Sequence, residues 1–272
     1  MKKLKGYPTI TDVLGLVLLL ALLQGIFGFA FKWIPNQGVV FILGALLSFG
    51  IIVYTGWRRT KKPFLKVFPL KPTPLIIYIP IFFIFFGLNI IVSEVDNITR
   101  WFFPVPDFLK GLMELYLSSG FLLYFIIGVI APLTEEYLFR GLVINGFREN
   151  YSKTTTIIVS ALIFSLMHLN PYQLFAAFTT GVLLAWIVLK TNSLVPCIII
   201  HSFFNLLNDI VGTTFNIKIG GYTAEPLVGL VEFQPLWFDI MGIVLFIGGL
   251  FSLIYLFRKL EREGRLNVYS TN

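Results

Sequence analysis

Residues 13–31 have the sequence VLGLVLLLALLQGIFGFAF, which contains no charged side chain. A helix needs about 20 predominantly apolar residues to cross the hydrocarbon core of a bilayer. This stretch therefore predicts a membrane-spanning helix near the start of the sequence. Lys2, Lys3 and Lys5 resemble the basic start of a signal peptide. Because the apolar stretch exceeds roughly 7–15 residues and no small-residue cleavage site follows it, we expect the helix to be retained.

The composition extends this prediction to the whole chain. Of its 272 residues, 57% are hydrophobic and 13% are charged, and the mean hydropathy is +0.84. A soluble domain carries about 25% charged residues, so the composition indicates an integral membrane protein. The net charge is +7, but Lys and Arg flank the apolar segments and form no basic stripe, so we expect no nucleic-acid partner. Cys197 is the single cysteine and lies in an apolar run, which excludes an internal disulfide.

Eight stretches are long and apolar enough, or nearly so, to span a bilayer. They cover residues 11–33, 38–57, 74–93, 118–146, 155–169, 172–190, 193–212 and 236–257. The fifth is short, and the fourth is long and interrupted. No internal repeat or long linker divides the chain. We therefore predict an all-α, polytopic membrane helical bundle that forms one integral membrane domain over residues 1–272.

The distribution of basic residues predicts the orientation of this bundle. If the N-terminus is cytoplasmic, the cytoplasmic connections hold sixteen Lys and Arg: Lys2, Lys3, Lys5, Arg58, Arg59, Lys61, Lys62, Lys66, Lys71, Arg148, Lys153, Lys190, Arg258, Lys259, Arg262 and Arg265. The opposite connections hold four: Lys32, Arg100, Lys110 and Lys218. Because cytoplasmic loops are enriched in Lys and Arg, we expect a multi-pass protein of the cell membrane with both termini cytoplasmic.

Few ionisable or strongly polar groups lie inside the predicted spans. Glu135, Glu136 and Arg140 lie in the fourth span, His168 in the fifth, and His201 with Asn205 in the seventh. Such groups are costly in a bilayer unless they are paired or hydrated, so each marks a candidate functional site. The i,i+4 spacing predicts an ion pair between Glu136 and Arg140. Glu135 is rotated by about 100° from Glu136, which leaves it free to face a cavity.

Two prolines predict irregular backbone near these groups. In an α-helix, Pro132 would leave the carbonyl of Gly128 without a partner, and Pro196 would do the same to the carbonyl of Asn192. Such breaks are tolerated in a membrane where the backbone lines a cavity or where neighbouring groups form hydrogen bonds with the free carbonyl.

The polar residues suit hydrolysis of a peptide bond by activated water. Glu135 can act as a general base, an imidazole can hold the water, and the second imidazole with Asn205 can donate to an oxyanion. The same atoms allow a zinc site, with Glu135, His168 and His201 as three ligands and water as the fourth. Simple hydrogen bonds between helices are a third explanation of the histidines and of Asn205. The residue types alone do not separate these readings.

Three motifs carry a resemblance to a known family. Residues 135–140 (EEYLFR) match E-E-x-x-x-R, residues 164–168 (FSLMH) match F-x-x-x-H, and residues 201–205 (HSFFN) match H-x-x-x-N. Together they resemble the CAAX-protease and bacteriocin-processing family (CPBP, or Abi) of intramembrane endopeptidases, which includes the type II CAAX prenyl endopeptidases. The motif-bearing part covers about residues 115–212.

The resemblance implies a role for each motif residue. It implies that Glu135 is the catalytic base, with His168 as its partner on the water, and that His201 and Asn205 stabilise the oxyanion. It implies that Glu136 and Arg140 support the site; Phe164, four residues before His168, lies where it can pack beneath the imidazole.

The resemblance also bears on cofactors and partners. The family is commonly called metalloprotease, so zinc is a candidate cofactor. Peptides or proteins at the bilayer, with or without a prenyl group, are the candidate substrates. The alternative is a non-catalytic membrane protein, either an immunity or scaffold partner or a transporter, that uses the same polar cluster for binding. A transporter would show paired broken helices in two related halves. The polar groups here are confined to the fourth, fifth and seventh spans, and this asymmetry favours the enzyme.

Overall fold

The computed structural model describes residues 6–117, 119–223 and 231–266, and within these ranges every regular element is helical. Seven helices are long and apolar enough to cross a membrane: Ile10–Ala30, Gln37–Thr60, Leu75–Phe102, Phe121–Asn150, Pro171–Thr191, Val195–Thr214 and Leu236–Arg262. The chain is therefore a multi-pass membrane protein, and the predicted all-α helical bundle is confirmed.

The fifth predicted span, 155–169, is the short helix α9 (Lys153–Met167). Ser152 caps its start, since the Ser152 hydroxyl accepts a hydrogen bond from the Thr155 amide at 3.1 Å. Two residues after its end, Leu169 adopts a positive φ of 50°, which takes the chain out of the helix before Pro171. With 15 residues, α9 is about 22 Å long, shorter than the roughly 30 Å core of a bilayer.

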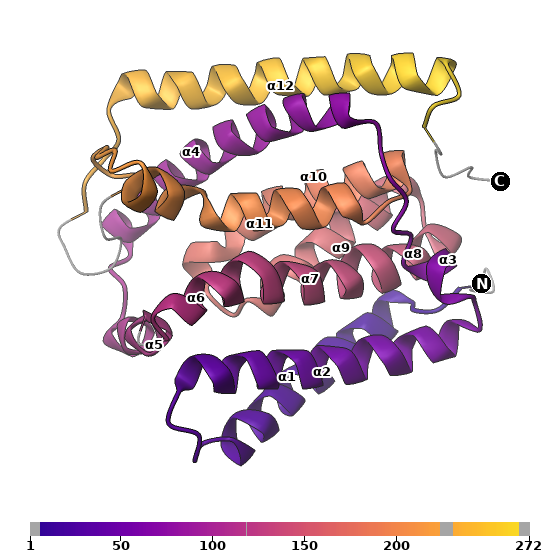
Figure 1. Cartoon of the computed structure of the whole chain (residues 1–272), viewed down its shortest axis with the longest axis horizontal. Helices are drawn as coiled ribbons and strands as arrows, with labels where there is room; N and C mark the ends of the chain where they lie inside the picture. Colours follow the sequence, from indigo (N-terminus) through magenta and orange to yellow (C-terminus); the bar gives the residue numbers. More distant parts are fainter. Residues whose placement is uncertain (1–5, 118, 224–230, 267–272) are drawn as a thin grey trace.

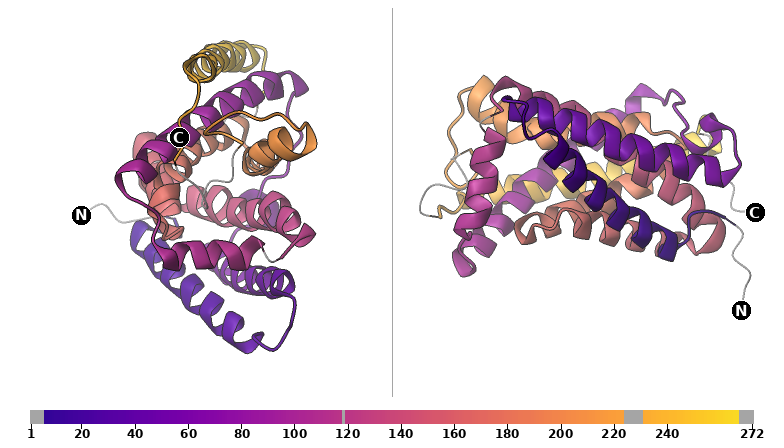
Figure 2. Two further views of the ribbon diagram at one scale, coloured as in Figure 1. Left: turned by 90° about the vertical axis from the view of Figure 1, so that its left-hand side faces the viewer. Right: turned by 90° about the horizontal axis from the view of Figure 1, so that it is seen from below.

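The helices form a stack with two outer sides (Figures 1 and 2). α1 (Ile10–Ala30) and α2 (Gln37–Thr60) pack on each other at one side, and α4 (Tyr78–Phe102) and α12 (Leu236–Arg262) pack on each other at the opposite side. Between them lie α9, α10 (Leu174–Thr191), α11 (Val195–Asp209) and the long helix of the fourth span. The short helices are α3 (Phe64–Val67), α5 (Asp107–Leu117), and the single turns η1 (Leu75–Ile77) and η4 (Pro171–Gln173).

Glycines let α12 approach the backbone of α4 closely. A Cβ atom on Gly87 would lie 2.4 Å from the carbonyl oxygen of Gly242, and one on Gly249 would lie 3.0 Å from the carbonyl oxygen of Pro80. Small residues at helix interfaces are the usual way to bring helices together in a bilayer, where apolar side chains gain little from leaving lipid. The pairing of α4 with α12 therefore follows from the positions of these glycines.

The fourth span is one continuous helix that twice changes its hydrogen-bond register. It consists of α6 (Phe121–Phe125), the π-helical segment η2 (Ile126–Ile130), α7 (Ala131–Glu136), the π-helical segment η3 (Tyr137–Val143) and α8 (Ile144–Asn150). π-helical turns are rare and frequently lie at functional sites. Glu135 and Glu136 lie in α7, directly between the two π-helical segments.

Side-chain contacts join the connections at one end of the bundle, on the right in Figure 1. The amide of Gly6 donates to Asn150 at 3.0 Å, and Lys62 forms an ion pair with Glu149. The Ser193 hydroxyl donates to the carbonyl of Lys71 at 2.6 Å, and Lys190 forms an ion pair with Glu261. We call this end, which carries most of the Lys and Arg residues of the connections, the basic end.

Another set of contacts joins the connections at the opposite end. Tyr172 donates to the carbonyl of Phe103 at 2.9 Å, and Asn97 donates to the carbonyl of Gly221 at 2.7 Å. The chain thus passes from the basic end at Asn150 to the opposite end at Tyr172 through α9. The start of α1 and the end of α12 lie together at the basic end (Figure 1), as eight passes require when α9 is counted.

Candidate active site

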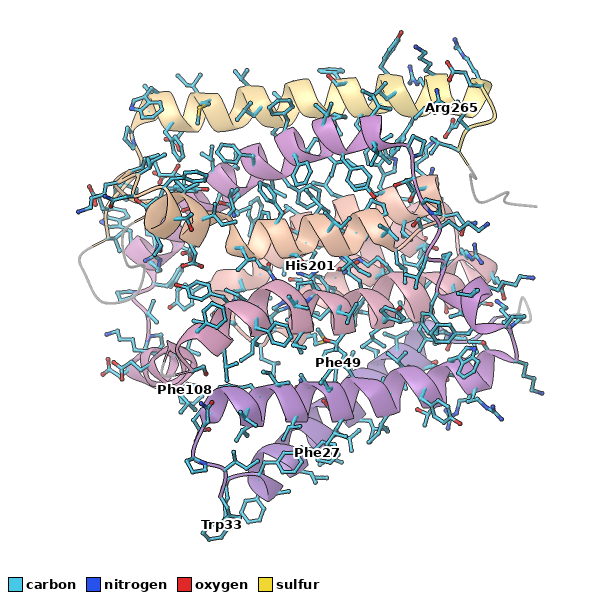
Figure 3. The ribbon with its side chains drawn as sticks, viewed as in Figure 1. Phe27, Trp33, Phe49, Phe108, His201 and Arg265 are labelled. Atoms are coloured by element: carbon cyan, nitrogen blue, oxygen red, sulfur yellow. The ribbon has the colours of Figure 1, made fainter. Side chains whose placement is uncertain are left out.

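His201 lies at the centre of the bundle, between α11 and α7 (Figure 3). It projects from α11, one turn before Asn205, and is 4% exposed. Pro196 lies in the first turn of α11, where its missing N–H has no intrahelical partner to lose. The predicted helix break at Pro196 is therefore wrong.

Glu136 connects His201 to Arg140. One carboxylate oxygen of Glu136, Oε1, accepts from Arg140 Nη1 at 2.7 Å and from His201 Nδ1 at 2.8 Å. The side chain of Glu136 is completely buried, and that of Arg140 is 2% exposed. The ion pair predicted from the i,i+4 spacing is thus present. The contact with His201 was not predicted, because no sequence signal fixes how α7 is rotated relative to a helix some 65 positions away.

The other ring nitrogen of His201 faces Glu135. Nε2 lies 3.8 Å from Glu135 Oε2, and the Glu135 side chain is 14% exposed. This separation is longer than a hydrogen bond. His201 therefore stands between two carboxylates, firmly bonded to the first and within reach of the second after a small movement.

Arg140 and Glu136 form a buried ion pair in this cluster, and Glu135 and His201 are its other ionisable groups. Arg140 is always protonated, so its buried partner Glu136 is most stable as the carboxylate. Glu135 and His201 then keep the cluster neutral if they hold one additional proton between them, either as Glu135 carboxylate with protonated His201 or as neutral Glu135 with neutral His201. Low dielectric surroundings favour a neutral cluster over a charged one. The buried pair of Arg140 with Glu136 meets this condition on its own.

Phe164 of α9 joins the three motifs. Its ring centroid lies 5.0 Å from that of His168 and 6.0 Å from that of His201, both edge-to-face, and 4.4 Å from the guanidinium carbon of Arg140. The last contact has the geometry of a cation–π interaction. The position of Phe164 fits the supporting role that the resemblance implies.

His168 lies just after α9, with one ring nitrogen engaged by the backbone. Its Nδ1 is 2.9 Å from the carbonyl oxygen of Phe164. Because a carbonyl only accepts, Nδ1 carries the proton and, in the neutral ring, Nε2 is an acceptor. Among the residues that the structure describes, no direct polar contact joins His168 to Glu135. The water shared by these two residues stays a prediction.

Asn205 is fixed to the irregular part of the fourth span. Its Nδ2 donates to the carbonyl of Ile127 in η2 at 3.0 Å. In this segment the amide of Ala131 donates to the carbonyl of Ile126, five residues earlier. In the same register, the carbonyl of Ile127 would accept from the amide of Pro132. Proline has no N–H, so this bond cannot form. The carbonyl that Pro132 leaves free is therefore that of Ile127, and the prediction of Gly128, which assumed an α-helical register, is wrong.

The arrangement does not fit a three-ligand zinc site. Within residues 6–117, 119–223 and 231–266, no three His, Cys, Asp or Glu side chains gather so that they could hold a metal ion. Nδ1 of His201 and Nδ1 of His168 are both engaged by oxygen atoms of the protein, so only the Nε2 atom of each ring could contact a further group.

Comparisons with known proteins support the resemblance. Residues 117–207 match the family model described as type II CAAX prenyl endopeptidase Rce1-like. This stretch contains all three motifs, and the match confirms the resemblance expected from them. The chain is also 30% identical over 83 residues to UPF0177 protein YxdF of Lactococcus lactis subsp. lactis (strain IL1403), an alignment that covers 30% of this chain and 45% of that protein. The chain thus spans less than half the length of this curated relative. No solved structure matches the chain.

Proposed function

We propose that this chain is an intramembrane endopeptidase that hydrolyses a peptide bond with water activated by Glu135. The observation that carries the proposal is the position of His201, whose two ring nitrogens face Glu136 at 2.8 Å and Glu135 at 3.8 Å. Further support comes from the Rce1-like match, because it covers the residues that form this cluster. CAAX-type intramembrane protease activity is what that match implies in general.

In the proposed reaction, Glu135 is ionised and His201 is protonated. Glu135 takes a proton from water as the water oxygen attacks the carbonyl carbon of the substrate, and His168 Nε2 accepts a hydrogen bond from the same water. The oxyanion accepts hydrogen bonds from His201 Nε2 and from the second amide proton of Asn205. Glu135 then gives its proton to the leaving nitrogen as the C–N bond breaks, which yields a carboxyl group and an amine and restores the site.

Buried Glu136 and Arg140 have a different part in this scheme. Glu136 accepts from His201 Nδ1, which directs Nε2 toward Glu135 and stabilises the positive charge of the protonated ring. Arg140 neutralises Glu136, and its guanidinium also lies 3.5 Å from the carbonyl of Gly181 in α10. These two residues position His201 and do not touch the substrate in this scheme.

The orientation and the substrate belong to the same proposal. The basic end faces the cytoplasm, in accordance with the positive-inside rule, so both termini are cytoplasmic. His201 lies eight residues after Ser193, which contacts the basic end, and is thus about 12 Å along the helix from that end. A membrane-associated peptide can approach from the cytoplasm or from the bilayer, and a prenylated CAAX tail is the candidate that the family match favours.

Cleavage of defined peptides tests the proposal. Wild-type protein in lipid nanodiscs and a Glu135→Gln variant are incubated with farnesylated CAAX peptides, with the same peptides lacking the prenyl group, and with unrelated membrane peptides. Mass spectrometry then identifies the products. We expect the wild type to cleave the farnesylated peptides and the variant to be inactive. Absence of wild-type cleavage across the panel would favour a non-catalytic binding role.

A further inference from the structure

A groove between α10 and α12 opens on the outer surface of the bundle. It has a volume of about 410 Å³, which lies in the range of about 300–1,000 Å³ typical of ligand sites. Its apolar wall consists of Val182, Leu183 and Trp186 from α10 and of Leu250, Ile254 and Phe257 from α12. Trp186 and Phe257 meet edge-to-face with their centroids 5.2 Å apart, so the two helices contact each other through aromatic rings of the groove.

Two cations complete the lining at the basic end of this groove. Lys190 belongs to the last turn of α10, and Arg258 lies four residues before the end of α12. Lys190 forms an ion pair with Glu261, whereas Arg258 is exposed and has no ionic or hydrogen-bonded side-chain partner in the described part of the chain. Lys259 and Arg262 add further positive charge to the same end of α12. The groove is therefore apolar along its length and positive at one end.

We propose that this groove binds one anionic glycerophospholipid, with an acyl chain along the apolar wall and the phosphate against Arg258 and Lys190. Basic pockets between membrane helices on the cytoplasmic side are suited to anionic lipid headgroups. A zwitterionic lipid also carries a positive group, which the same cations repel, so its binding is weaker. Trp186 lies one helical turn before Lys190 in α10, and indole rings are enriched at the membrane–water interface. The site therefore selects anionic over zwitterionic lipid.

A lipid in this groove would restrain the helix that contacts the polar cluster. Val182 lines the groove, and its neighbour Gly181 accepts from Arg140 at 3.5 Å. A Cβ atom on Gly181 would lie 3.0 Å from the side chain of Ala161, so α10 is packed closely against α9 at this level. Because the lipid binds the folded bundle and not separated helices, binding raises the temperature of unfolding.

Thermal unfolding and native mass spectrometry in a neutral detergent test the site. Purified protein is titrated with phosphatidylglycerol and, separately, with phosphatidylcholine. Arg258→Gln removes the free cation, and Lys259→Gln is the matched control, because it removes an equal charge from the neighbouring position, which does not line the groove. Ile254→Trp fills the groove, and its control is Ile79→Trp in the separate, uncharged groove between α4 and α12.

We expect the wild type to bind phosphatidylglycerol more tightly than phosphatidylcholine and to unfold at a higher temperature with it. Arg258→Gln should weaken phosphatidylglycerol binding about fivefold. One cation near a membrane surface contributes about 1 kcal/mol to the binding of an anionic lipid, which corresponds to this factor in the dissociation constant. Lys259→Gln and Ile79→Trp should bind as the wild type does. Equal binding of the two lipids by the wild type, or equal losses in Arg258→Gln and Lys259→Gln, would overturn the proposal. The Arg258→Gln result stands even if Ile254→Trp does not fold.

Discussion

At the scale of single residues, the arrangement around His201 gives the two neighbouring carboxylates different surroundings. Glu136 is completely buried and holds both Arg140 and His201, whereas Glu135 is partly exposed and has no hydrogen bond in the described residues. A residue that positions a ring must hold it firmly, and a residue that transfers a proton must be able to release it. In the proposed reaction, adjacent positions in α7 would therefore serve stability and chemistry separately.

Glu136→Gln should lower the stability of the protein far more than Glu135→Gln. The first change leaves Arg140 as a buried charge without a compensating partner, which costs about 3–5 kcal/mol. The second removes a charge that has no hydrogen bond and is partly exposed. The free energy of unfolding in mixed detergent micelles measures the difference. Equal losses in the two variants would contradict the division of functions.

A strong chelator should leave peptide cleavage unchanged. The described residues contain no group of three ligands for a metal, and the proposed base and oxyanion donors act without one. The measurement is the cleavage rate before and after dialysis against the chelator, with added zinc as a further sample. Loss of cleavage that zinc restores would show that a metal belongs to the site.

At the scale of elements, the sequence predicts what happens within a helix better than what happens between helices. The ion pair of Glu136 with Arg140 follows from an i,i+4 spacing, and it is present. The bond from Asn205 to Ile127 could not be predicted, because it depends on the π-helical register of η2. Hydrophobic periodicity does not report such a register, and neither does it fix the rotation of α7 against α11. The sequence therefore predicts candidate site residues but not the contact of Glu136 with His201.

A double-mutant cycle of Pro132 and Asn205 tests the π-helical register. Asn205→Ala should destabilise the protein by about 1–3 kcal/mol, because the carbonyl of Ile127 loses its donor. Pro132→Ala supplies an N–H five residues after Ile127, so Asn205→Ala should cost much less in that background. The free energies of unfolding of the four proteins measure the coupling.

The cycle also separates the two expected functions of Asn205. If Asn205 donates to the oxyanion, the double variant regains stability but not activity. If the losses of unfolding free energy in the two single variants add up to the loss in the double variant, to within about 0.5 kcal/mol, Pro132 and Asn205 are not coupled through Ile127.

At the scale of the whole molecule, the bundle has two distinct ends with different charge. Contacts such as those of Lys62 with Glu149 and of Ser193 with Lys71 collect the basic connections at one end. Apolar spans and the charge of their connections predict this arrangement well, because both follow from the cost of placing charge in a bilayer. The length of α9 does not by itself predict a span, because a helix of 15 residues is shorter than the hydrocarbon core of a bilayer. The helix nevertheless crosses the interior of the bundle.

Cysteine labelling in intact cells should report opposite sides for the two ends. Lys66→Cys places a thiol at the basic end, and Lys110→Cys places one at the opposite end; both positions are exposed. Cys197 is buried and serves as the background. An impermeant maleimide should label the Lys110→Cys protein in intact cells and the Lys66→Cys protein only after permeabilisation. The reverse pattern would place both termini outside.

The central claim is that Glu135 is the base of a hydrolytic site, and the cleavage rate of Glu135→Gln tests it most directly. The matched control is Glu263→Gln, which makes the same change at an exposed carboxylate after α12 that pairs with Arg265. All three proteins must first show the same unfolding temperature. With a peptide that the wild type cleaves, we expect Glu263→Gln to retain the full rate and Glu135→Gln to lose about 10²-fold or more. Cleavage by Glu135→Gln at the wild-type rate would contradict the account.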